Sequence, residues 1–581
     1  MCIRDRQDTL ARVVEFCLAE GPKYGLQLHT LKGPRGKPGK SALYLPQGTA
    51  LEQFMQMGIE VHNSGIPRIY GDGTSDGFKK LLGAPVGGTN FVSESALGIV
   101  NASHENTKQI GALADKQLEW LLLSYCAAPK IVHLARMVKH STLGPAIHAH
   151  DAAIRGELDR MLAGDFRPPP QGIDDVRFRI AQLPVRDGGM GLHNMSLVSP
   201  GAMMASLAGV HEQLKKINDR AQKQYLTALL SFIPRSNDYT ESRVKYESLI
   251  SRDGADDHSS GSSDSLDDMA KVADLKQKGL SKEVYAVEVT RIRDSVGSRS
   301  FQAHFLSEAG EGAGDWLRVI PSGFKFFRAP SVTFVDMLRG RLFMDYLGAG
   351  VLRGCPRAPQ SATCQSAQGE VISKGLHWKT SCKHGRVSTR SAGVKKILYE
   401  AMRRIHISCD LETLGLLQCG NQRPADLFVP AGGDLGNGAD QVFDVTIVDP
   451  TAEGMLSLGS PQVALLAARE GEKKKVNDFA AAVRNQGGLW QAAECRPLAF
   501  ESSGAWGPSA LEILAELKAL AQGLDLNNLK MSGLDYTWSA NSFVSWYRQR
   551  VSFYMAKSTA VQVRSVITMA RNSARAHRGG G

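Results

Sequence analysis

Two aspartates on neighbouring strand-like segments are the residues of this chain best suited to chemistry. Asp426 follows a Pro-Ala step in RPADLFVP (423–430), and Asp444 lies within FDVTIVDP (443–450). Side chains alternate along a strand, so Asp444 and Thr446 should share the face opposite Phe443. An acid on a strand beside the core is costly unless it is paired or binds metal. Two carboxylates held close in this way predict a Mg²⁺ or Mn²⁺ site that could act on a phosphodiester. The competing interpretation is a strand aspartate that caps a turn.

A third charged group is expected from the segment that follows. Many restriction-type nucleases carry the second acid two residues before a lysine, but Thr446 occupies that position here. Residues 460–486 begin with Ser-Pro and are followed by Gly-Gly, which predicts one helix. Counting back from Val476 on its expected inward face places Lys473 toward the strand. We predict that Lys473 orients the attacking water or stabilises developing charge, and that Lys474–Lys475 point more toward solvent.

Glu501 is a further candidate catalytic residue. It ends the apolar run from Leu498 to Phe500, which predicts another buried strand. A carboxylate at this position could join the same site, or it could simply be a residue at a strand end.

Upstream, three cysteines and a histidine predict a zinc site. Cys355, Cys364, His377 and Cys382 have the spacing C-x8-C-x12-H-x4-C. Three thiolates and one imidazole can complete a tetrahedral Zn²⁺ site, although this spacing is looser than that of a zinc finger. His384 is an alternative fourth ligand, and four unrelated residues remain the alternative to any metal site.

The charge balance favours a polyanionic partner. The chain of 581 residues has a formal net charge of +11 and a pI near 9.1. From Tyr536 onward the sequence contains no Asp or Glu, whereas Arg548, Arg550 and further basic residues accumulate among aromatic ones. This pattern suits phosphate contact with base stacking, or else an amphipathic helix with a solvated basic face. Candidate nucleic-acid contacts are Lys32, Arg35, Lys37, Arg548 and Arg550.

Several classes of protein are disfavoured by the sequence. It has no signal peptide and no apolar run of the length that a membrane helix needs. The nine cysteines suggest no disulfide framework. We therefore expect neither secretion nor membrane insertion.

The chain is expected to be an α+β multidomain protein. Hydrophobic periodicity predicts helices over 95–165 and 197–233, and the acidic Ser/Gly-rich run 251–268 predicts a disordered linker. The length is typical of two to four domains. The expected ranges are 1–90 (partial palm), 91–233 (helical thumb-like), 234–270 (linker), 271–350 (helical linker domain), 351–410 (zinc knuckle), 411–525 (α/β, restriction-endonuclease-like) and 526–581 (basic helical tail).

Segments in collinear order give these ranges their names. They are EGPKYGLQLHTLK (20–32), KKLLGAPVG (79–87), LPVRDGGMGL (183–192), DWLRVIPS (315–322), MLRGRLFM (337–344), the cysteine-histidine run and RPAD…DVT. Their order resembles the C-terminal part of a non-LTR retrotransposon reverse transcriptase that carries a restriction-like endonuclease. The resemblance covers nearly the whole chain. It implies target DNA and element RNA as partners, Mg²⁺ and Zn²⁺ as cofactors, target-DNA nicking as the activity, and the nucleus as the location if the element is active, otherwise the cytoplasm.

The chain departs from this pattern in two places. The Tyr-x-Asp-Asp turn of the polymerase is absent; Asp174–Asp175, before an expected strand-like run, and Asp267–Asp268 have the wrong context. The resemblance therefore implies a fragment that lacks the fingers and most of the palm, with no polymerase activity of its own. The family's Arg-His pair is also altered, because Ser391 follows Arg390. A nucleic-acid-binding remnant without catalysis is the alternative function.

Overall fold

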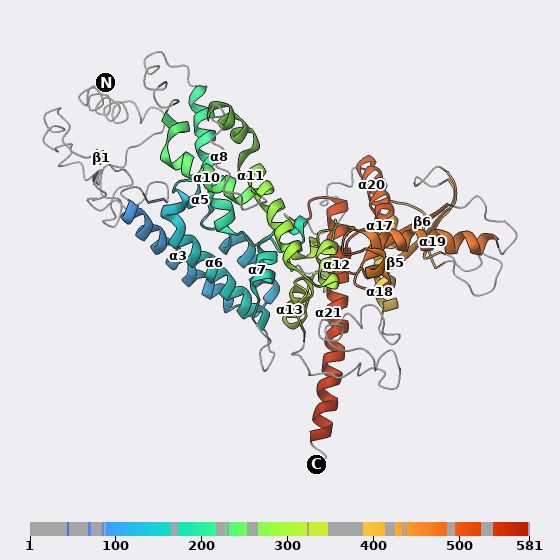
Figure 1. Ribbon diagram of the computed structural model, residues 1–581. Coiled ribbons are helices and arrows are strands. Elements are labelled where there is room, and N and C mark those ends of the chain that lie inside the picture. Colours follow the sequence, from blue (N-terminus) through green and yellow to red (C-terminus); the bar gives the residue numbers. More distant parts are fainter. Residues whose placement is uncertain are drawn as a thin grey trace, which may run out of the picture. The chain divides into compact units, whose positions relative to one another are not determined.

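The protein is mainly helical, with a small four-stranded mixed sheet in its C-terminal half (Figure 1). A computed structural model describes residues 43–45, 68–70, 84–85, 89–163, 172–216, 227, 230, 232–251, 265–321, 325–346, 387–412, 425–432, 435, 438–484, 494–524 and 539–578. None of the helices in these ranges is both long and apolar enough to cross a membrane.

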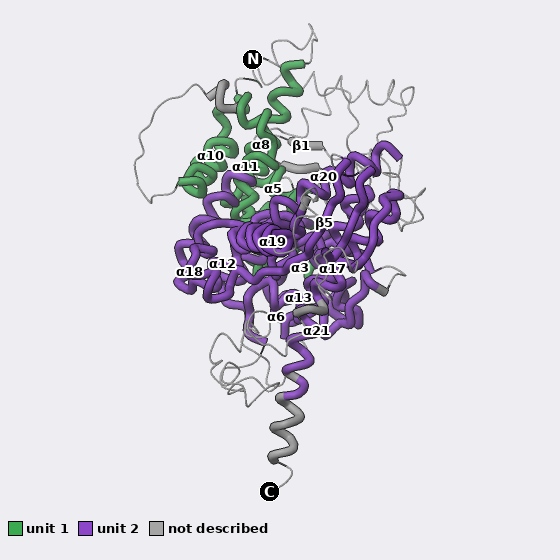
Figure 2. The backbone as a smooth tube through the Cα atoms, turned by 90° about the vertical axis from the view of Figure 1, so that its right-hand side faces the viewer, with its two compact units in different colours: residues 1–105, 130–152, 195–281 green, residues 106–129, 153–194, 282–581 purple. Residues whose placement is uncertain are grey.

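The chain divides into two compact units whose sequence ranges interleave (Figure 2). Unit 1 consists of residues 1–105, 130–152 and 195–281, and unit 2 of residues 106–129, 153–194 and 282–581. The ranges expected from the sequence are consecutive, whereas each unit here gathers distant segments. The disordered linker expected over 234–270 is wrong in part, because residues 237–250 form a helix and another helix begins at Ser265.

Unit 1 is built around an apolar core that its helices share. The helices that contribute to it, in whole or in part, are α3 (Thr89–Gly111), α5 (Val132–Ala135), α6 (His140–Ala163), α8 (Met195–Lys215), α10 (Asn237–Ile250) and α11 (Ser265–Ser295). Buried residues of α3, α5, α6 and α8, among them Val100, Leu134 and Ile147, form one cluster. The strands β1 (Leu43–Leu45) and β2 (Arg68–Tyr70) pair in parallel. The expected helices over 95–165 and from 197 onward are confirmed within the described ranges.

The helical part of unit 2 surrounds a second core. It contains α4 (Lys116–Leu122), a π-helical turn (Leu123–Ala127), α7 (Asp175–Gln182), α12 (Arg299–Glu308), α13 (Ser331–Arg341), α21 (Phe543–Arg578) and the 3-10 turns Val185–Asp187, Asp315–Arg318 and Lys325–Phe327. The strand-like run expected after Asp174–Asp175 is wrong. Asp174 caps the helix α7 by accepting a 2.8 Å hydrogen bond from the Arg177 amide, which is the usual role of Asp at an N-cap.

The sheet of unit 2 has the order β3-β4-β5-β6. Its strands are β3 (Asp410–Leu411), β4 (Leu427–Val429), β5 (Gln441–Val448) and β6 (Glu494–Glu501). Antiparallel pairing joins β3 to β4 and β4 to β5, whereas β5 and β6 are parallel. The helices near it are α17 (Val387–Arg404), α18 (Glu453–Leu458), α19 (Leu466–Arg484) and α20 (Pro508–Gly523). Parallel strands need a crossover connection, and α19 lies within the one between β5 and β6.

Glycine brings α19 unusually close to the sheet. A Cβ atom placed on Gly471 would lie 2.7 Å from Val448 Cγ2 and 3.2 Å from Thr446 Cγ2. Two turns further along, Phe479 packs against the Val442 cluster at the other end of β5. The helix therefore runs antiparallel to β5. Lys475, midway between Gly471 and Phe479, lies next to Asp444.

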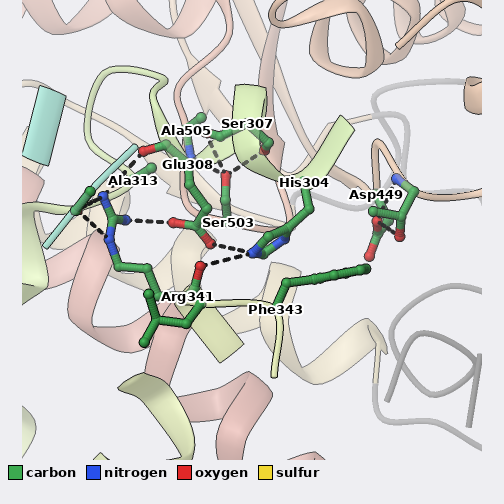
Figure 3. A network of polar contacts seen from close by, with 12 residues as sticks. His304, Ser307, Glu308, Ala313, Arg341, Phe343, Asp449, Ser503 and Ala505 are labelled. Carbon is green, nitrogen blue, oxygen red and sulfur yellow. Dashed lines mark hydrogen bonds and ion pairs between the residues drawn. The ribbon is translucent and has the colours of Figure 1, made fainter. Parts of the chain in front are cut away.

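A buried polar network attaches the end of β6 to the helices of unit 2 (Figure 3). Arg341 of α13 forms an ion pair with Glu308 of α12 and donates a 2.9 Å hydrogen bond to the Gly189 carbonyl. The hydroxyl groups of Ser307 and Ser503 lie 2.6 Å apart, which joins α12 to the turn after β6. This network fixes the sheet on its helical support.

Candidate functional site

Three acids lie close together beside the sheet: Glu412 directly follows β3, Asp426 directly precedes β4, and Asp444 lies within β5. Leu427 pairs with Phe443, so the next residue pair in this antiparallel register is Asp426 opposite Asp444. Leu411 pairs with Leu427 in the same way, which places Glu412 opposite Asp426. The backbone departs from this regular pairing at Asp426, because Asp426 N donates to Phe443 O (2.9 Å), whereas Glu412 N donates to Asp426 O (3.0 Å) as the β3–β4 register requires. Side-chain contacts nevertheless join the three acids. Lys395 bonds to both Glu412 and Asp426, and the carboxyl groups of Asp426 and Asp444 are hydrogen-bonded to each other. These contacts define the carboxylate row Glu412–Asp426–Asp444.

Two lysines from different helices neutralise part of this row. Lys395 of α17 lies 2.8 Å from Asp426 Oδ1 and also forms an ion pair with Glu412. Lys475 of α19 lies 2.8 Å from Asp444 Oδ2 and 2.9 Å from its Oδ1. Opposed like charges destabilise a sheet, and these ammonium groups offset that repulsion.

The environment of the row changes the acidity of its members. Burial, together with the charge and hydrogen bond of Asp426, raises the pKa of Asp444 despite the opposing effect of Lys475. Burial lowers the pKa of Lys395, but Asp426 and Glu412 outweigh it, so that this pKa is raised overall. The Asp426 Oδ2 atom accepts a 2.9 Å hydrogen bond from the Val445 amide, which fixes that carboxylate. The row is thus acidic, ordered and short of positive charge.

The prediction that Lys473 faces the strand is wrong. Lys473 is exposed, and Lys475, which was expected to point toward solvent, reaches Asp444 instead. The predicted inward face relied on Val476, which is 42% exposed. The real inward face follows small residues, Ala468 and Gly471, because they allow the helix backbone to approach the sheet. The helix also begins at Leu466 rather than at Ser460.

The prediction of Glu501 as a catalytic residue is also wrong in its geometry. In the parallel register Glu501 pairs with Val448, whereas Asp444 pairs with Pro497, four residues earlier. A strand rises about 3.3 Å per residue, so Glu501 is roughly 13 Å further along the sheet. Burial raises its pKa, while Ser307 and the amides of Ala467 and Ala468 lower it. Glu501 is therefore the last residue of β6, and its carboxyl group lies near the first turn of α19.

The two predicted nucleic-acid contacts on α21 are occupied by intramolecular partners. Arg548 pairs with Asp315 and Glu311, and Arg550 pairs with Glu400. The guanidinium of Arg550 also lies over the Phe326 ring, 4.5 Å from its centroid. The nearby aromatic residues Tyr547 and Phe553 are buried. The absence of acids from the tail favours a stacking surface or a solvated basic face, but acids from elsewhere in unit 2 pair with these two arginines.

Other predicted sites lie outside the described residues. These are the zinc ligands Cys355, Cys364, His377 and Cys382, the alternative ligand His384, and the basic residues Lys32, Arg35 and Lys37. Arg390 is described and buried, and it donates to the Thr559 hydroxyl of α21.

Sequence reasoning missed Glu412 and Lys395. Glu412 has a positive φ of 51°, a region that few residues other than glycine adopt, and no sequence pattern marked it. Lys395 lies two residues after Gly393, where a Cβ atom would overlap the Tyr554 ring of α21. A glycine at a helix crossing was the available signal, and it shows that α17 is packed closely against α21.

The carboxylate oxygens of the row suit a hard divalent cation whose remaining ligands are water and substrate. Within the described ranges, no three His, Cys, Asp or Glu side chains are placed to hold a metal ion together. Asp426 and Asp444 nevertheless provide two adjacent carboxylates, and Mg²⁺ is commonly bound by one or two carboxylates, water and substrate phosphate. The residues present therefore fit a metal ion completed by substrate and water.

No family model and no curated protein matches this chain.

Proposed function

We propose that residues 387–524 carry a restriction-type, metal-dependent DNA endonuclease, in a chain that resembles the C-terminal part of a non-LTR retrotransposon reverse transcriptase. The site would nick target DNA and release a 3′-OH that can prime reverse transcription. The collinear motifs support the family, and the acids beside Lys475 support the activity. No polymerase activity is proposed for this chain.

The observation that carries the proposal is the hydrogen bond between the carboxyl groups of Asp426 and Asp444, with Lys475 bonded to Asp444. A divalent ion bound there would activate water and stabilise charge on the phosphate. Asp426 is held by the Val445 amide, and Asp444 by Lys475. Lys475 would donate to the phosphate oxygens as negative charge develops in the transition state. This role replaces the one predicted for Lys473.

The test is a nicking assay of the full chain on supercoiled DNA with Mg²⁺ or Mn²⁺. Asp444→Asn keeps the size of the side chain and removes its charge, so nicking should fall to background. Asp478→Asn is the matched control, because Asp478 lies on α19 and pairs with the exposed Lys474. It should nick at the wild-type rate. Equal nicking by wild type and Asp444→Asn would refute the assignment of the site.

A catalytically inactive nucleic-acid-binding remnant is the second candidate, and the net charge of +11 favours it. It would bind DNA or RNA with a strong salt dependence and cleave neither with Mg²⁺ nor with Mn²⁺. A gel shift at two salt concentrations beside the nicking assay separates the two functions.

A further inference from the structure

The carboxylate row carries more acid than its lysines balance. Glu412, Asp426 and Asp444 supply three negative charges when ionised, and Lys395 and Lys475 supply two positive ones. A divalent ion added to this set leaves a single positive charge, which one phosphodiester neutralises. Without Lys395, the same row would carry two net negative charges before any metal binds.

Lys395 differs from Lys475 in the number of acids that it contacts and in its exposure to solvent. Lys475 contacts one acid, whereas Lys395 contacts both Glu412 and Asp426. The Lys395 side chain is only 11% exposed, compared with 28% for Lys475. It comes from α17, whose Gly393 contact with Tyr554 fixes the helix on α21. Lys395 is thus a buried ammonium group that joins two acids, one directly after β3 and one directly before β4.

We propose that Lys395 is a positioning residue whose ammonium group occupies a cation position between Glu412 and Asp426, so that the row binds one divalent ion fewer than it otherwise would. The inference concerns the proposed endonuclease site and rests on that function for its catalytic meaning. Lysine supplies a compact point charge with three donors, so it can neutralise two carboxylates without becoming a ligand for the metal. The metal is then confined to the Asp426–Asp444 side of the row.

The experiment counts Mn²⁺ ions bound to the full chain, by electron paramagnetic resonance of free Mn²⁺ during titration. Lys395→Met keeps the length of the side chain and removes its charge, so this variant should bind one more Mn²⁺ per chain than wild type. Lys395→Arg retains the charge and should give the wild-type count. Lys396→Met is the matched control on an exposed neighbour of α17, and it should also give the wild-type count.

The difference between the counts, rather than their absolute values, decides the inference. Equal counts for wild type and Lys395→Met would overturn it. If wild type and Asp444→Asn bind the same number of Mn²⁺ ions while Lys395→Met binds one more, the inference on Lys395 stands. In that case the proposed metal site of the endonuclease at Asp444 is refuted. Ions held elsewhere in the chain cancel in this comparison.

A second variant keeps the inference testable if Lys395→Met does not fold. In Glu412→Gln, Lys395 forms an ion pair with Asp426 alone, so its positive charge offsets more of the negative charge of Asp426. Mn²⁺ affinity at the Asp444-dependent site should then fall by roughly tenfold, since one nearby negative charge is lost. An unchanged affinity would contradict a charge-balancing role for Lys395.

Discussion

Unit 2 contains two clusters of acids and bases that differ in how completely they are enclosed. In the network of Figure 3, Arg341 and Glu308 are 1% and 6% exposed, and backbone carbonyls take up further donors of Arg341. In the carboxylate row, Asp426 and Asp444 are 24% and 23% exposed, and acids outnumber lysines. The first cluster is enclosed and charge-balanced, whereas the second is open to solvent and acidic.

This difference favours a structural role for the first cluster and agrees with the chemical role that we propose for the second. A buried ion pair is expensive to break because each partner would be left charged without a counterion. A partly exposed row with surplus acid can bind a cation or a proton, and water can reach it. Removing a charged side chain should therefore lower the stability of the fold at the first cluster, and should weaken cation binding at the second.

The largest expected effect is on the enclosed network. Arg341→Met leaves Glu308 buried without its partner, so the free energy of unfolding should fall by roughly 3–5 kcal/mol. Urea unfolding of the full chain, followed by tryptophan fluorescence, measures this change. Arg186→Met is the control in unit 2, because Arg186 is 52% exposed, and it should change stability by less than about 1 kcal/mol. Similar losses for both variants would remove the distinction between the clusters.

The next largest expected effect is a difference in nicking rate between variants of two nearby lysines of α19, Lys475 and Lys473. Lys475→Met should slow nicking by about 10²–10³-fold, or roughly 2.7–4 kcal/mol, if Lys475 stabilises transition-state charge. Lys473→Met should stay within about threefold of wild type, because Lys473 is exposed away from the row. Single-turnover nicking rates at saturating DNA test this order. The reverse order would restore the role first predicted for Lys473.

A third comparison uses Asp151, a partly buried acid of unit 1 that forms no ion pair with the residues described here. Burial raises the pKa of Asp151 to about 6, while hydrogen bonds from Met195 and Ser196 and the charge of His148 oppose the shift. The folded state therefore holds this proton up to a higher pH than the unfolded state, whose pKa is about 3.9. Stability should fall as pH rises from about 4 through about 6, by an amount on the order of 1–2 kcal/mol. Urea midpoints across this range should be flatter for Asp151→Asn, and an unaltered slope would reject the assignment.

The smallest expected effect is at the row itself. Asp444→Asn removes a carboxylate whose ionisation is already disfavoured by burial and by Asp426. Its stability should stay within about 1 kcal/mol of wild type and should rise slightly in the absence of metal, because repulsion between neighbouring acids is relieved. Thermal unfolding without divalent ions measures this. A loss as large as that of Arg341→Met would show that the row is structural.

Much of the local structure followed from the sequence. The alternation around Asp444 correctly gave a strand with Phe443 and Val445 buried, and the run before Glu501 correctly gave another. Long periodic segments such as α3 and α6 were recognised because their apolar residues recur at helical spacing. The start of α19 was not predicted correctly. The Ser-Pro pair favours a helix start at Ser460, but the chain forms turns there and the helix begins at Leu466.

Side-chain partners required the tertiary structure. Lys475 and Lys473 lie two residues apart on one helix, and only the close approach at Gly471 decides which of them meets Asp444. Glu412 and Lys395 come from segments that no motif joined, and the register of β3 on β4 and the packing of α17 bring them together. Arg548 and Arg550 looked unpaired because their acids come from distant segments.

The sequence by itself determined where acids, bases and periodic elements occur, because propensity and alternation act over a few neighbouring residues. The tertiary structure decided which charges meet, because strand register and helix depth are set by packing between segments far apart in the chain. Asp426 and Asp444 were found from their local patterns. Their lysines and the third acid were decided by the fold.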